Sequence, residues 1–76
     1  MSTVPLTDLK SGACGVIERL EGEEALQKRL ADLGLVPGTS VRFIRRAPLG
    51  DPLEIEFRGV HLALREKDAK NVLLKV

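Results

Sequence analysis

The chain has 76 residues, of which 43% are hydrophobic and 30% are charged, and its net charge is +1. A chain of this length forms one domain, here residues 1–76, and buries only about 60% of the surface that it exposes when unfolded, which leaves no room for an enclosed substrate cavity. The balanced charge gives no reason to expect a nucleic-acid partner. Since there is no apolar run of the ~20 residues that a membrane span needs, and no signal peptide, we expect a cytoplasmic protein that is not itself inserted in a membrane.

The N-terminal part of the chain predicts a short turn over residues 6–9 and then a strand over about 14–20. Val16 and Ile17 supply the apolar content of that strand, although their alternation with polar residues is weak. Cys14 is the single cysteine, so neither an internal disulfide nor a cysteine-cluster metal site can form. Its apolar context predicts a thiol packed in the interior.

Residues 23–33 form the clearest helix of the sequence. Leu26, Leu30 and Leu33 recur at i, i+4 and i+7 and make one apolar stripe, and Gly34 follows where helices commonly end. A helix of about three turns is not stable alone. The stripe must therefore dock on a sheet.

Two strands and a tight turn follow the helix. Pro37 and Gly38 are the residues that a type II turn prefers at its two central positions. Residues 41–45 then predict a strand with Val41 and Phe43 facing inward. Beyond a connecting loop, residues 53–57 alternate between apolar and polar side chains, as a half-buried strand does.

A hairpin joins residues 53–57 to a further strand over 60–64, because only two residues separate the segments. The expected register pairs Phe57 with Val60, Ile55 with Leu62, Leu53 with Leu64, and Glu56 with His61. A helical turn over 66–70 and a last strand over 72–76 complete a mainly β chain of about five strands. A sheet of this size with one apolar face must curl into a small barrel to bury that face.

The sequence contains few of the residue patterns on which enzyme active sites depend. The chain has one histidine and one cysteine, shows no spacing that suggests a catalytic triad, and lacks both glycine-rich phosphate-loop patterns. We predict no catalytic residue and no required cofactor.

His61 and Glu56 are the candidate metal ligands, because the hairpin register sets them opposite each other, near Glu54. They could bind a divalent ion such as Fe²⁺ or Zn²⁺ weakly, or share one between two subunits of a weak homodimer. The competing interpretation, which we favour, is a solvated cross-strand pair.

Arg42, Arg45 and Arg46 form a local basic cluster. Alternation along the strand places Arg42 and Arg46 on the face of Glu54 and Glu56, which favours ion pairs across the hairpin over nucleic-acid binding. Arg45 shares the parity of the inward residues, so we expect it to lean over the following loop.

The loop "RRAPLGDP", residues 45–52, is longer and stiffer than a hairpin needs. Its two prolines restrict the unfolded chain and favour an ordered loop. Leu49 at the tip is apolar and needs either the core or a partner to cover it. A rigid loop with an exposed apolar tip is suited to binding protein.

Residues 30–72 resemble the FeoA family, the small cytoplasmic component of bacterial ferrous iron transport. The matching motifs are "LGL", "PG" and "APLGDP", at the family's spacing. The resemblance implies an SH3-like β-barrel that acts with FeoB, a membrane permease with a GTP-binding domain, at the inner face of the inner membrane. The iron-dependent repressors end in similar domains and supply the alternative, a metal-responsive module. The partner-binding residues that we predict are Leu33, Gly34, Leu35, Pro37, Gly38, Arg45, Arg46, Pro48, Leu49, Gly50, Asp51 and Pro52.

Overall fold

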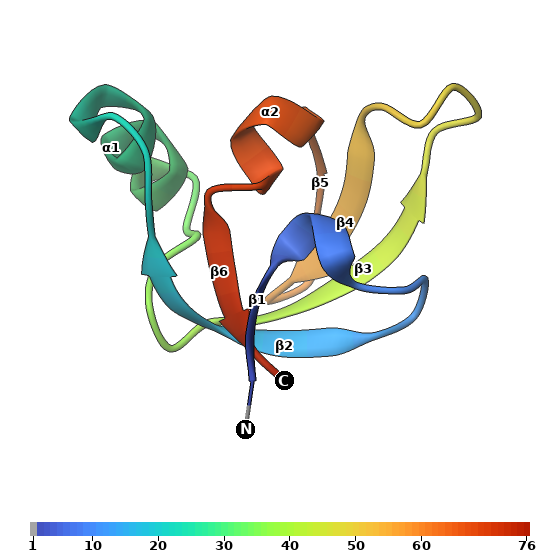
Figure 1. Cartoon of the computed structure of the whole chain (residues 1–76), viewed down its shortest axis with the longest axis horizontal. Coiled ribbons are helices and arrows are strands. Elements are labelled where there is room, and N and C mark those ends of the chain that lie inside the picture. The colour runs from blue at the N-terminus through green and yellow to red at the C-terminus, as the bar shows by residue number, and fades with distance from the viewer. Residues whose placement is uncertain (1) are drawn as a thin grey trace.

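A computed structural model describes residues 2–76 as a single antiparallel sheet with two helices at one end (Figure 1). The strands lie in the order β1-β6-β2-β3-β4-β5. Their bounds are β1 Thr3–Pro5, β2 Cys14–Leu20, β3 Ser40–Arg46, β4 Leu53–Phe57, β5 Val60–Leu64 and β6 Val72–Lys75. The helices are α1 Glu24–Asp32, α2 Glu66–Ala69 and the 3-10 turn η1 Leu6–Asp8. The expected mainly β fold is confirmed.

The sheet has six strands, one more than the sequence analysis predicts. β1 has three residues and pairs with β6, setting Val4 opposite Leu74. A strand this short shows no readable alternation, and Pro5 argues against a strand in any central position. Long-range pairing with the C-terminal strand creates this element.

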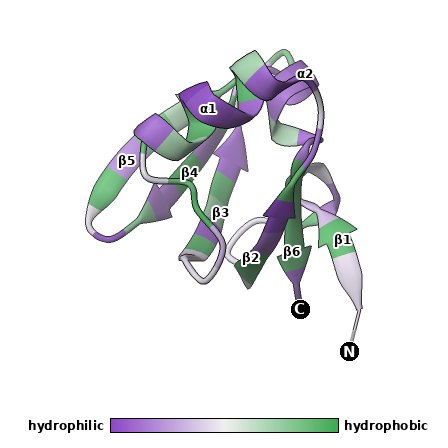
Figure 2. Ribbon diagram, turned by 90° about the vertical axis from the view of Figure 1, so that its left-hand side faces the viewer, coloured by the Kyte–Doolittle hydropathy of each residue, from purple (hydrophilic) through white to green (hydrophobic). Residues whose placement is uncertain are grey.

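The sheet curls around one apolar core, and α1 and α2 cover one end of it (Figure 2). Leu30 is the buried residue of α1, as its apolar stripe predicts, and Ala69 is that of α2. The other buried apolar side chains come mainly from the strands: Leu6, Ile17, Leu35, Val41, Phe43, Leu53, Ile55, Phe57, Leu64, Val72 and Leu74.

The β4–β5 hairpin has the predicted register at every pair, including Glu56 opposite His61. Its two turn residues, Arg58 and Gly59, both have positive φ, 50° and 76°. Positive φ at both central positions is the signature of the type I′ turn that matches strand twist.

A β-bulge at Ile44 overturns the predicted facing of the arginines. Phe43 pairs with Ile55 but Arg45 pairs with Glu54, so β3 contains one residue more than β4 at this point. The extra residue inverts the alternation beyond it. Arg46 therefore points inward and is half-buried, while Arg45 stays exposed. The prediction that Arg45 leans over the loop was wrong.

Cys14 is exposed, which corrects the prediction of a packed thiol. In β2 the inward positions are Gly15 and Ile17, so Cys14 and Val16 face out. A Cβ at Gly15 would lie 3.0 Å from Leu74 Cβ. This close approach of two strands fixes the facing of β2, and the weak alternation of the sequence gives no sign of it.

Candidate functional site: the β3–β4 loop and the helical end of the barrel

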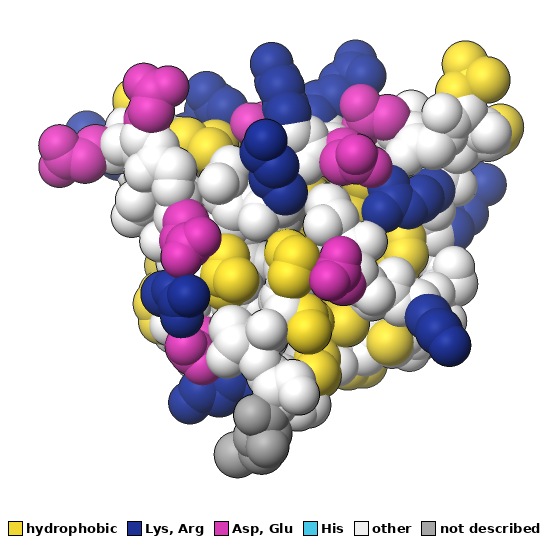
Figure 3. Space-filling model, viewed as in Figure 1, with side chains coloured by type: hydrophobic (Ala, Val, Ile, Leu, Met, Phe, Trp, Pro, Cys, Tyr) yellow, Lys and Arg dark blue, Asp and Glu magenta, His cyan; other side chains and the backbone are white. Residues whose placement is uncertain are grey.

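The β3–β4 loop, residues 47–52, is an ordered structure that carries Leu49 at its tip. The Ala47 N–H donates to Pro52 O at 3.0 Å, and the Gly50 N–H donates to Ala47 O at 2.7 Å. Leu49 is 97% exposed, so it faces solvent and not its own barrel. Figure 3 shows apolar atoms projecting at the corner that this loop occupies in Figure 1.

Arg46 holds the loop against the N-terminal part of the chain. Its guanidinium donates to Gly50 O at 3.1 Å, to Thr7 O at 2.9 Å and to the Glu66 carboxylate at 2.6 Å. The planar group with five donors can serve three acceptors in fixed directions. Arg46 is therefore a structural brace for the loop.

Asp51 ties the other side of the loop to α2. Its Oδ1 accepts a hydrogen bond of 3.0 Å from the Glu66 N–H, one of the first-turn amides that helices leave unpaired. Arg65 Nη1 lies 3.8 Å from Asp51 Oδ2 and adds a partly exposed ion pair. The loop and α2 are thus one connected unit, with Leu49 as its free end.

The segment Leu33–Gly38 ends α1 and turns the chain into β3. The Gly34 N–H donates to Ala31 O at 2.9 Å and the Leu35 N–H donates to Leu30 O at 3.0 Å. This is the Schellman arrangement, in which glycine takes the left-handed conformation and the residue after it packs on the helix. Gly34 has φ of 104°, as the motif requires.

Leu35 is fully buried, so the prediction that it contacts a partner is corrected. Its side chain belongs to the core, where the Schellman motif places it. In the same motif Leu33 remains 46% exposed. The "LGL" motif therefore mainly serves to end the helix, and it leaves one leucine, Leu33, facing outward.

The Pro37–Gly38 turn forms as predicted, with Gly38 at φ of 92° and the Thr39 N–H donating to Val36 O at 3.1 Å. The structure does not bring this corner to the β3–β4 loop. In Figure 1 α1 and the loop occupy opposite upper corners, and α2 lies between them. The predicted partner-binding residues therefore fall into two separate groups.

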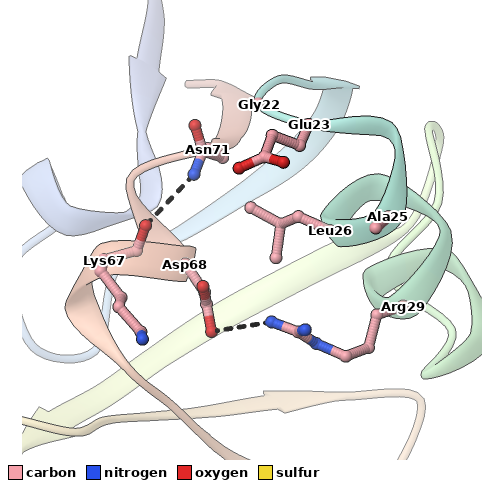
Figure 4. Close-up of a pocket in the computed structure, with 8 residues that line it drawn as sticks. All are labelled: Gly22, Glu23, Ala25, Leu26, Arg29, Lys67, Asp68 and Asn71. Atoms are coloured by element: carbon pink, nitrogen blue, oxygen red, sulfur yellow. Dashed lines mark hydrogen bonds and ion pairs between the residues drawn. The ribbon is translucent and has the colours of Figure 1, made fainter.

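A groove between α1 and α2, which the sequence did not reveal, lies between those two groups (Figure 4). Its volume is about 460 Å³, and Arg29 Nη2 lies 3.4 Å from Asp68 Oδ2 across it. The lining residues are Gly22, Glu23, Ala25, Leu26, Arg29, Lys67, Asp68 and Asn71. Both helices were predicted, but only the tertiary structure places them side by side.

Glu56 and His61 lie close together, as the hairpin register predicts, with 3.7 Å between Glu56 Oε2 and His61 Nε2. Glu56 also forms an ion pair with Arg42. Within residues 2–76 no group of three or more His, Cys, Asp and Glu side chains could hold a metal ion. One chain thus offers two ligands, half of the set that a tetrahedral ion takes.

The arginines of β3 are engaged by carboxylates. Arg42 pairs with Glu56, and Arg45 Nη2 lies 3.0 Å from Glu54 Oε2. The prediction of cross-hairpin pairs is confirmed for Arg42. Because of the bulge, Arg45 and not Arg46 lies opposite Glu54, and Arg46 pairs with Glu66.

The comparisons with known proteins identify the family. A family model described as the FeoA domain matches residues 4–76. This chain belongs to the FeoA family. Within the described residues, 2–76, no helix is long and apolar enough to cross a membrane.

The relatives include a fusion of Fe(2+) transport protein A with the Fe(2+) transporter FeoB from Porphyromonas gingivalis, 33% identical over 67 residues. That match takes in 88% of this chain but only 8% of the fusion protein.

Solved FeoA structures share the fold. The Chlorobium tepidum FeoA structure is 35% identical, with a TM-score of 0.86 over 96% of this chain and 70% of its own. The zinc complex of Stenotrophomonas maltophilia FeoA is 30% identical, with a TM-score of 0.82 over 95% of this chain and 89% of its own. That protein is described as a prokaryotic SH3 domain, which confirms the SH3-like fold expected here.

A manganese-dependent transcriptional repressor matches with a TM-score of 0.85, over 95% of this chain and 40% of its own. At 14% identity this likeness extends to the fold alone.

Proposed function

We propose that this chain is a non-enzymatic accessory protein of bacterial ferrous iron uptake that binds the cytoplasmic GTP-binding region of a FeoB-like permease. The supporting observation is the P. gingivalis fusion, in which a domain similar to this chain is joined to the transporter itself. Fusion fixes two partners at high effective concentration. In this proposal the chain works in the cytoplasm, where its partner recruits it to the inner face of the inner membrane.

The docking surface in this proposal is the helical end of the barrel, with the β3–β4 loop as its anchor. Leu49 is solvent-exposed and its loop is already ordered by Arg46 and Asp51. Binding through a loop that is already ordered loses little conformational entropy. The α1–α2 groove and the outward Leu33 extend the same end of the molecule.

Replacing Leu49 by alanine should weaken binding to the permease's GTP-binding region by about tenfold or more, because a buried apolar anchor supplies much of an interface's energy. Titration calorimetry with that region measures the change. The urea midpoint of the variant should equal that of the parent, since the Leu49 side chain is almost fully exposed.

Val16→Ala is the matched control, because Val16 is also an exposed apolar residue, 41% accessible, but lies on β2. It should leave the affinity unchanged. Equal affinity of the Leu49 variant and the parent would refute the loop as the anchor, while absence of binding by the parent would refute the proposed function.

A metal-responsive module is the second candidate, favoured by the zinc in the S. maltophilia relative and by the Glu56–His61 pair. Because one chain offers two ligands here, the ion would be shared by two copies. Zn²⁺ should then raise the sedimentation coefficient, a chelator should reverse the rise, and His61→Ala should abolish it. A sedimentation coefficient that does not change when Zn²⁺ is added would contradict this candidate.

A further inference from the structure

β5 is an open edge of the sheet. Among the described residues it pairs with β4 alone, and the sheet order ends on it. Because the type I′ turn makes Phe57 and Val60 a hydrogen-bonded pair, bonding along the hairpin alternates from there. His61 and Ala63 therefore direct their N–H and C=O groups away from β4. Within residues 2–76, neither N–H has a backbone partner in another element.

The two edges of the sheet differ in how they are protected. β1 has three residues and contains Pro5, and short edge strands and prolines both discourage further pairing. β5 has five residues in unbroken register, with no proline, lysine or bulge. Val60 is 46% exposed and Ala63 is also exposed. An edge of this kind is a template for another strand.

We propose that β5 pairs antiparallel with β5 of a second copy of this chain, about a twofold axis at Leu62. This register joins the free backbone groups of His61 to those of Ala63 in the second copy, and the reverse. On the inner face, Val60 lies opposite Leu64 of the second copy, and the two Leu62 side chains lie opposite each other. The edge is therefore self-complementary, as an isologous dimer requires.

Hydrogen-bonding groups on the outer face support this register. Across β3, β4 and β5, Arg45 pairs with Glu54 and Glu54 lies opposite Ala63. The second copy continues the same row with His61, then Glu56, then Arg42. His61 would thus stand next to the small Ala63, between two carboxylates.

The surface leaves space for that histidine. A hollow of about 220 Å³ is lined by Glu54, Leu62 and Ala63, together with the chain's own His61. Pairing by five residues a side buries less than a standard interface of about 1,200–2,000 Å². The dimer is therefore weak and depends on concentration, and it is independent of both the permease and any metal.

Sedimentation equilibrium in a chelating buffer, from micromolar to millimolar protein, tests the pairing. The parent should approach a dimer, and Ala63→Lys should raise its dissociation constant by at least about tenfold, because a lysine on an edge strand resists burial against another strand. In the monomer this lysine lies opposite Glu54, so folding is retained. Ala25→Lys, the same change at an exposed position of α1, is the matched control and should leave the constant unchanged.

Crosslinking tests the register. In a Cys14→Ser background, His61→Cys and Ala63→Cys variants should form a disulfide when mixed and mildly oxidised, because hydrogen-bonded strand pairs lie about 5.5 Å apart at Cα, within disulfide range. Each variant alone should crosslink far less. A parent that stays monomeric at every concentration, a dimer insensitive to Ala63→Lys, or one that dissociates in the chelator would overturn the proposal.

Discussion

Replacing Leu35 by alanine is expected to lower the free energy of unfolding by about 2–5 kcal/mol, the cost of a cavity left by a buried leucine. Leu35 is fully buried and its N–H closes the helix-ending motif on Leu30 O. Small domains are stable by only about 5–15 kcal/mol, so this loss is a large fraction of the total. Urea unfolding followed by circular dichroism measures it.

Leu33→Ala, two positions earlier in the same motif, is the matched control. Leu33 is 46% exposed, so its truncation should cost less than about 1 kcal/mol. Equal losses at the two positions would show that the burial assigned to Leu35 is wrong. A large loss of partner affinity in Leu33→Ala with little loss of stability would support the place of Leu33 in the proposed docking surface.

Arg46→Ala is expected to lower the free energy of unfolding by about 2–3 kcal/mol, because it removes the donor of three hydrogen bonds and leaves half-buried carbonyl groups unpaired. The two carbonyls, Thr7 O and Gly50 O, lie on segments far apart in sequence. The variant should melt roughly 10–20 °C lower. Calorimetry measures the melting temperature.

Arg45→Ala tests whether the loss of stability comes from the hydrogen bonds of Arg46 or only from removing a positive charge. Arg45 is 60% exposed and pairs with Glu54 at 3.0 Å, and such surface pairs contribute at most about 1 kcal/mol. Comparable melting temperatures for the two alanine variants would refute the role given to Arg46. Faster hydrogen exchange at Gly50 in the Arg46 variant alone would support it.

The sequence by itself determined most of the local structure, because local structure depends on spacing. The recurrence of Leu26, Leu30 and Leu33 located α1, and the two residues between β4 and β5 fixed every pair of that hairpin. The motifs "LGL" and "APLGDP" also pointed to the family that the comparisons confirm. The stiff loop with an apolar tip was predicted as well, although its role in binding stays a prediction.

Only the tertiary structure decided which way side chains face and which distant segments meet. One inserted residue, Ile44, reversed the roles of Arg45 and Arg46, and strand alternation cannot reveal a bulge. β1 exists because β6 offers it a partner, and Cys14 faces out because Gly15 packs on Leu74. Whether Leu49 folds back or faces solvent depended on the same long-range contacts. Arg46 and Asp51 bind the loop to η1 and α2 and leave that leucine outside.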